Sequence, residues 1–244
     1  MSQESAIESF KKFQQSWIEQ LQHNLNHLRS AQHHYRNSVT GSEVLLREAV
    51  ERVMEHCREY HRAKCATTEK DVIGVMAAPW SSALERSLHW VGGWRPTTLF
   101  HLVYTESSIL FESRIVDILR GFRTGDLSDL SPSQFRVKFV KGRTVSELQC
   151  ETVKEENAIT EELSEWQDDA SELVMGTTSD VDQRIRRLAE IVHRADDLRL
   201  QTITGVVELL GPLQQAEFII AAVELRAGVS GWGTSHDRRR TSDI

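Results

Sequence analysis

Apolar residues recur at intervals of three and four along most of the chain, the spacing that places them on one face of an α-helix. The first stripe predicts a helix over residues 4–32, with Gln14 and Asn24 interrupting its seam. Similar stripes predict helices at 44–57, 109–122, 185–198 and after Gly211-Pro212. No segment alternates in the manner of a strand. The pattern therefore predicts an all-α multi-helix bundle, with one domain over residues 1–233 and a mobile basic tail at 234–244.

One expected helix is long and acidic. Ser131-Pro132 gives a serine cap and a proline at the first helical position, and the apolar stripe that follows continues to about Met175, with Gly142 as a candidate break. Between Thr144 and Met175 there are ten carboxylates and one lysine, which sum to −9; since the whole chain carries −7, the remainder carries +2. The acidic positions either are simply solvated or form a surface for a partner, and the pattern leaves both readings open.

The composition indicates a globular protein, with 39% hydrophobic and 27% charged residues. The net charge of −7 disfavours a strongly basic nucleic-acid-binding protein. The three cysteines have no Cys-x-x-Cys spacing, which fits a reducing compartment. Because no charged-then-apolar leader opens the chain and the longest apolar run, 218–223, is short, we expect neither export nor a membrane span.

The most distinctive stretch is residues 80–96, which contains three of the six tryptophans. Ser82 and Glu85 have the spacing of a capping box and predict the start of a short helix. Gly92 or Gly93 is expected to take the left-handed conformation that ends this helix, and Pro96 suits the first turn of the next. So much tryptophan indicates either packing or recognition.

This stretch resembles the central motif of the plant Delay of Germination (DOG) domain, which the TGA class of bZIP transcription factors also carries. Other segments resemble the same family in the same order: an aromatic helix with Phe10, Phe13, Trp17 and Gln20, then residues 126–134, 195–202 and 214–218, and a Trp-Gly element at Trp232-Gly233. The end of the chain is similar to the DOG branch and not to the TGA branch. The resemblance therefore covers nearly the whole chain.

The resemblance implies a non-enzymatic regulatory protein that acts by protein–protein interaction in seed dormancy and abscisic acid signalling. Its motif residues are expected to be mainly structural, and they are Trp80, Glu85, Trp90, Gly92, Gly93, Arg95, Pro96, Asp197, Arg199, Trp232 and Gly233. Members of the family use their N-terminal region to engage clade A type 2C protein phosphatases, which would make Phe10, Phe13, Trp17 and Leu21 the partner-binding residues. The alternative is that these aromatic residues close the core of the bundle.

Haem is a further implication of the resemblance, because the best-known DOG proteins hold it with two histidines just before the Trp-Gly element. Aligned on Trp232-Gly233, those positions are Arg226 and Ser230, and neither side chain replaces a neutral imidazole as an axial ligand. The other candidates for haem are His23 and His27, four residues apart on one helix face, and His236. We expect no natural metal site.

Catalysis and direct DNA binding find little support in the motifs. The chain has no Gly-x-Ser-x-Gly, no phosphate-binding glycine loop and no His-Glu-x-x-His. TGA proteins read DNA with a basic leucine zipper, and Arg238-Arg239-Arg240 is too short to replace one. This basic cluster is typical of a solubilising or nuclear-targeting tail, so we expect the protein in the nucleus and the cytoplasm.

Two alternatives to the phosphatase hypothesis remain open. TGA domains imply homodimers that hold an acyl ligand, so the chain could be a sensor for haem or a fatty acid. It could also be a transcriptional co-regulator that joins TGA-type bZIP partners without a bZIP of its own. Calmodulin is a further candidate partner, because the N-terminal helix is amphipathic and aromatic.

Overall fold

The computed structural model describes residues 5–37, 40–103, 144–168 and 181–242. Within these ranges the backbone forms helices and connecting turns with one isolated bridge, between Trp90 and Gly93, which confirms the expected all-α class. Three expected features lie outside the described residues: the helix at 109–122, the motif at 126–134 and the helix start at Ser131-Pro132.

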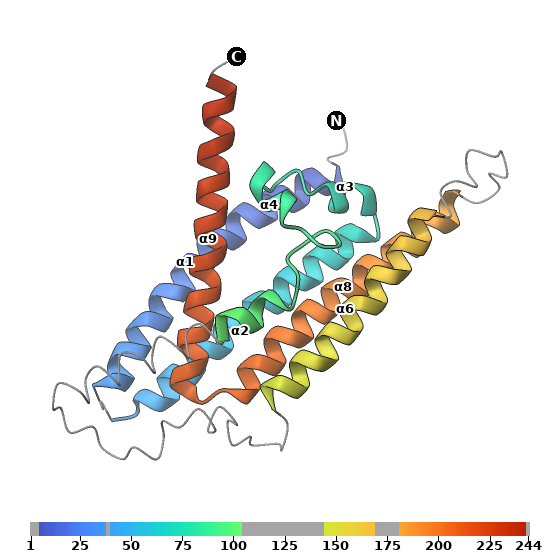
Figure 1. Cartoon of the computed structure of the whole chain (residues 1–244). Coiled ribbons are helices and arrows are strands. Elements are labelled where there is room, and N and C mark those ends of the chain that lie inside the picture. Colours follow the sequence, from blue (N-terminus) through green and yellow to red (C-terminus); the bar gives the residue numbers. More distant parts are fainter. Residues whose placement is uncertain (1–4, 38–39, 104–143, 169–180, 243–244) are drawn as a thin grey trace.

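Helices α1 (Ala6–Arg36) and α2 (Ser42–Thr68) form an antiparallel pair along one side of the molecule (Figure 1). Ser5 caps α1 by accepting a hydrogen bond from the backbone of Glu8 at 3.2 Å. The apolar stripe expected for this helix faces inward, and Gln14 and Asn24 are buried with it. The sequence thus predicted both the helix and its imperfect seam.

Helices α6 (Val145–Asp168) and α8 (Val181–Leu209) form a second long pair (Figure 1). The described part of the acidic helix begins shortly after Gly142, where Thr144 and Glu147 make reciprocal hydrogen bonds of 3.0 and 2.6 Å. The acidic face of α6 is partly paired within the protein, because Arg194 of α8 bonds Glu155 at 2.6 Å and also pairs with Glu162. Part of the negative charge of α6 is therefore already neutralised within the protein.

The segment between the two pairs holds the short helices α3 (Val72–Ala77) and α4 (Ala83–Ser87). The capping box of Ser82 and Glu85 at the start of α4 is confirmed. The expected end of α4 was wrong: the helix stops at Ser87, because the following backbone tightens into i→i+3 hydrogen bonds. Gly92 does take the left-handed conformation, with φ +67°, but in the turn that joins Trp90 to Gly93.

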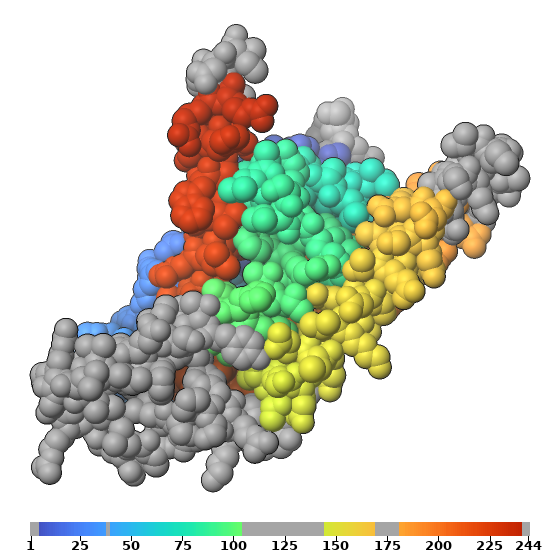
Figure 2. Space-filling model, viewed as in Figure 1, coloured from blue at the N-terminus to red at the C-terminus, as the bar shows by residue number. Residues whose placement is uncertain are grey.

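Helix α9 (Pro212–Ser242) begins at the expected proline, runs past α4, and projects beyond the rest of the described structure at its C-terminal end (Figures 1 and 2). The expected mobile tail at 234–244 is instead helical as far as Ser242. The physical reason is that the tail lacks a helix breaker after Gly233 and ends in arginines, which favour a helix and suit its C-terminal dipole. Asp237 also accepts a hydrogen bond from the backbone of Ala83 at 2.9 Å, which ties the tail to α4.

Two groups of buried apolar side chains hold these elements together. The larger one joins α1 and α2 to the start of α6, the end of α8 and the start of α9. The smaller one joins α3 and the turn at Val91 to the middle of α6 and α8. Among the described residues, no helix is long and apolar enough to cross a membrane.

Candidate functional site

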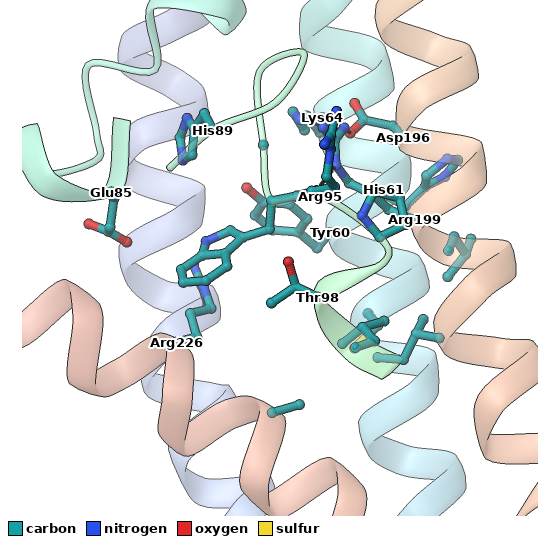
Figure 3. A pocket seen from close by; sticks show the side chains of 18 of the residues that line it. Tyr60, His61, Lys64, Glu85, His89, Arg95, Thr98, Asp196, Arg199 and Arg226 are labelled. Atoms are coloured by element: carbon teal, nitrogen blue, oxygen red, sulfur yellow. Dashed lines mark hydrogen bonds and ion pairs between the residues drawn. The ribbon is translucent and has the colours of Figure 1, made fainter. Parts of the chain in front are cut away.

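A cavity of about 280 Å³ lies where α1, α2, α8 and α9 meet the segment 80–102, and we call it the central cavity. Figure 3 labels polar side chains of the lining that come from α2, α8, α9 and the segment 80–102, and Gln14 of α1 also lines the cavity. The cavity brings together many of the residues singled out in the sequence, namely Trp17, Leu21, Trp80, Glu85, Gly92, Gly93, Arg95, Pro96, Arg199 and Arg226.

Arg199 of α8 fastens the glycine turn of the tryptophan motif to the bundle. Its Nε donates to the carbonyl of Trp94 at 2.7 Å, and its Nη2 donates to the carbonyls of Trp90 and of Val91, the latter at 2.9 Å. A Cβ on Gly93 would lie only 3.0 Å from the guanidinium carbon. The close approach of Arg199 therefore favours glycine at position 93. The motif has a structural role, because it fixes this turn to α8.

Lys64 and Asp196 form a buried ion pair behind this turn. The two side chains are 4% and 5% exposed, and Lys64 Nζ lies 2.8 Å from Asp196 Oδ1 and 2.9 Å from the carbonyl of Gly92. Arg199 contacts the same carboxylate oxygen at 2.5 Å. Burial raises the pKa of Asp196, but attraction to Lys64 and Arg199 outweighs it and holds the pKa below its ordinary value. The carboxylate thus stays ionised between two cations.

Trp90 connects the same turn to α6. Its indole nitrogen donates to Thr160 at 2.9 Å, and the guanidinium carbons of Arg95 and Arg199 lie 5.6 and 5.4 Å from its ring centroid. Glu156, almost fully buried, lies 3.6 Å from Arg95 and accepts a backbone hydrogen bond at 2.8 Å from the residue after Pro96. Residues 90–97 are therefore held from two sides, by α6 and by α8.

The N-terminal aromatic residues lie in the interior. Phe10, Trp17 and Leu21 are buried, and Phe13 is half-buried against the same core. Trp17 donates from its indole nitrogen to the carbonyl of His56 at 2.8 Å and stacks on the His56 ring at 4.8 Å. These four side chains are thus parts of the core, and Trp17 and Leu21 also face the central cavity.

The histidine candidates do not converge on the cavity. His23 and His27 lie on the exposed side of α1, where their Nε2 atoms are 2.9 Å apart. His236 is exposed on α9, 3.7 Å from the Asp237 carboxylate. No group of three or more histidine, cysteine or acidic side chains among the described residues has the arrangement of a metal site. Arg226, which occupies one of the two ligand positions that the resemblance implies, lines the cavity and is no axial ligand, and none of His23, His27 and His236 lines it.

The two residues of the Trp-Gly element have different environments. Gly233 is buried against α4, and a Cβ there would lie 2.1 Å from Ser82 Oγ, so only glycine fits. Trp232, its neighbour, is 70% exposed. The glycine is therefore structural, whereas the tryptophan is left at the surface.

Sequence analysis did not identify several residues that are important in the structure. Lys64, Asp196 and Glu156 are buried charges, and Tyr60 and His89 line the central cavity. The available signal was that Lys64 and Asp196 fall on apolar helix stripes, where a charge needs a buried partner. Asp197 was singled out instead of its neighbour, but it is largely exposed and bonds His61 at 2.8 Å.

Comparison with known protein families gives a match over residues 24–105 to the family described as DOG1, seed dormancy control. Over 93% of its length the chain is 28% identical to the protein DOG1-like 4 of Arabidopsis thaliana, of which it covers 92%. It is 23% identical to DOG1-like 3 of the same plant over 80% of this chain and 74% of that protein.

The chain is also similar to transcription factors of the TGA class. It is 25% identical to the transcription factor TGA1 of Arabidopsis thaliana over 94% of its own length. That match covers only 58% of TGA1, so the chain spans little more than half of this relative. These findings confirm the resemblance that the tryptophan motif indicated.

Proposed function

Because the chain carries a DOG1 seed dormancy control domain and is related to DOG1-like proteins and TGA transcription factors, we propose that it is a regulatory protein without enzymatic activity. It acts by binding other proteins in seed dormancy and abscisic acid signalling. The partner that we propose is a clade A type 2C protein phosphatase.

The observation that carries this proposal is an exposed tryptophan on an ordered helix. Trp232 of α9 precedes Gly233, which packs against the start of α4, and two more large apolar side chains in and just after α4 are exposed, Leu84 at 38% and Leu88 at 48%. We call these three residues, together with the basic end of α9 at 238–240, the α4–α9 surface. Figure 2 shows the end of α9 rising beside α4 on this face. Exposed tryptophan is costly in water and is strongly enriched among the residues that dominate protein interfaces.

The packing of α9 on α4 fixes the position of this tryptophan. Gly233 lets the two helices touch, and Asp237 bonds the first turn of α4 one helical turn later. Trp232 is therefore presented on a braced element, which lowers the entropy lost when a partner orders it. The four N-terminal residues Phe10, Phe13, Trp17 and Leu21 support the fold in this proposal and do not form the contact, because all but Phe13 are buried.

The test is a calorimetric titration of the full chain with a clade A type 2C phosphatase. Trp232→Ser removes the proposed anchor, and Ile73→Ser is the matched control, because Ile73 is 54% exposed on α3. We expect saturable binding, a loss of roughly 30-fold or more for Trp232→Ser at a hot spot, and a change below about threefold for Ile73→Ser. No binding by the folded wild-type chain, or equal losses for both variants, would refute the proposal.

The TGA relationship supports a second candidate function, a transcriptional co-regulator in the nucleus and cytoplasm that joins a DNA-bound TGA-type factor. The similarity to TGA1 extends over almost the whole of this chain, which is the observation that favours it. A gel-shift assay with a TGA-type factor and its DNA site tests this candidate. A further retarded band that requires the chain supports it, and an unchanged complex at micromolar concentration rejects it.

A further inference from the structure

The central cavity has features of a small-molecule binding site, and it is separate from the α4–α9 surface. Its walls are mainly apolar, with aromatic side chains such as Trp17, Trp80 and Trp94 and aliphatic ones such as Leu99 and Ile203. Ligand sites are typically concave and apolar with a few fixed polar groups. The identity of those polar groups therefore decides which ligand the cavity fits.

The cavity has a surplus of positive charge. Four cationic side chains line it, Lys64, Arg95, Arg199 and Arg226, and two carboxylates, Glu85 and Asp196. Three of the cations already have partners. Lys64 and Arg199 share Asp196, and Arg95 pairs with Glu156 just outside the lining.

Arg226 is the cation that remains. Its guanidinium carbon lies 4.9 Å from the ring centroid of Trp17, and no carboxylate among the described residues pairs with it. Glu85 is committed elsewhere, since its Oε2 accepts from both the backbone nitrogen and the hydroxyl of Ser82 at 3.0 Å. A half-buried guanidinium on an apolar wall therefore lacks a counter-ion within the described part of the protein.

Tyr60 supplies a second polar group of the cavity and neighbours the same tryptophan as Arg226. Its ring centroid lies 4.8 Å from that of Trp17, the residue on which Arg226 rests. Burial raises the pKa of Tyr60 while the positive charge of Arg226 opposes that rise, which reflects their proximity. In the described ranges its hydroxyl has no hydrogen-bond partner. Figure 3 shows Arg226 on one side of the cavity, the Lys64–Asp196 pair on the other, and Tyr60 between them.

We propose that the central cavity binds a compact monocarboxylate with an apolar ring. Its carboxylate pairs with the guanidinium of Arg226 and accepts a hydrogen bond from the Tyr60 hydroxyl, while its ring packs between the tryptophans and the aliphatic wall. A planar guanidinium with one neighbouring hydroxyl suits a carboxylate, because both oxygens then gain a donor.

The volume of the cavity argues for a compact ligand. At about 280 Å³ it holds the space of roughly nine water molecules, and it lies just below the usual range for small-molecule sites, which begins at about 300 Å³. A macrocycle or an extended acyl chain would need more room. Aromatic side chains on one wall favour a ring over a flexible chain, because ring packing costs less conformational entropy.

The test uses 1-naphthaleneacetate as the probe, with its methyl ester as the uncharged match, titrated into the full chain by calorimetry and tryptophan fluorescence. Arg226→Met removes the charge but keeps an unbranched apolar side chain, and Arg52→Met on the exposed side of α2 is the control. Tyr60→Phe removes the hydroxyl alone. Denaturant unfolding of each variant establishes that it is folded.

We expect one-to-one binding of the acid, roughly tenfold or more weaker binding of the ester and of acid to Arg226→Met, and a smaller loss for Tyr60→Phe. Arg52→Met should bind as the wild type does. No binding of the acid, equal binding of acid and ester, or unchanged affinity in folded Arg226→Met would overturn the proposal. Tighter binding of hexadecanoate than of the ring acid would overturn the compact class of ligand. None of these outcomes depends on phosphatase binding.

Discussion

Replacement of Asp196 by asparagine provides a sharp test of how the tryptophan motif is held. The carboxylate bonds Lys64 at 2.8 Å and Arg199 at 2.5 Å, and the Lys64 side chain is only 4% exposed. Asparagine keeps the size of the side chain but removes its charge. Two cations then face each other without an anion, one of them buried and unable to reach water.

The expected cost follows from this geometry. Breaking a buried pair by removing one partner typically costs about 3–5 kcal/mol, because the remaining charge is left desolvated. For a domain with an unfolding free energy of about 5–15 kcal/mol, that is a large fraction of the total. Asp197→Asn is the matched control, since its side chain is 56% exposed, bonds only to His61 among the described residues, and should cost about 0–1 kcal/mol.

The assay is urea unfolding of the wild type and both variants at pH 7, followed by circular dichroism and tryptophan fluorescence. The pKa of Asp196 lies below its ordinary value in the folded protein, so its stabilisation is present above that ordinary value and is lost as pH falls below it. The wild type should therefore approach Asp196→Asn in stability at strongly acid pH. A cost for Asp196→Asn within about 1 kcal/mol of that for Asp197→Asn at pH 7 would refute the reasoning.

Two further predictions concern the C-terminal helix and the cavity. Gly233→Ala should destabilise the protein and loosen α9 from α4, because its Cβ would meet Ser82 at 2.1 Å. Gly231→Ala, whose Cβ would have nothing within 4 Å, should instead stabilise the helix by up to about 1 kcal/mol. Thermal unfolding of both variants tests the pair, and a shift of the melting temperature with the same sign in both would contradict it. Burial, aided by nearby cations, lowers the pKa of His89 to about 4. As the pH is lowered from 6.5 to 4, the unfolded chain therefore gains this proton before the folded protein does, and the free energy of unfolding decreases. His89→Gln should flatten that part of the pH profile, and a profile unchanged by the substitution would count against the assignment.

The fold class could be predicted from the sequence because helical periodicity reports directly on which face is buried. The stripe of α1 and the capping box of Ser82 and Glu85 are local signals, and both are confirmed. The end of α4 was missed because the tightening of the backbone after Ser87 leaves no clear mark in the sequence, and the course of the C-terminal tail was missed because it depends on contacts distant in sequence. The tail is tied to α4 through Gly233 and Asp237, more than 140 residues away along the chain.

The candidate site was less predictable than the fold. The motif residues around Gly93 could be recognised, but the reason for the second glycine is Arg199, which approaches from another helix. The buried charges were missed because a lysine or an aspartate on an apolar stripe does not reveal its partner. The exposure of Trp232 was likewise not visible, since a tryptophan in a recurring motif suggests a core position until the course of the helix that carries it is seen.

The measurement that tests the central claim most directly is hydrogen–deuterium exchange of the chain with and without a clade A type 2C phosphatase. If the α4–α9 surface is the contact, backbone amides of residues 83–89 and 226–240 should gain protection in the complex, while those in the middle of α1 stay unchanged. Protection confined to the outer face of α1, or none at saturating phosphatase, would contradict the assignment of partner binding to the exposed tryptophan.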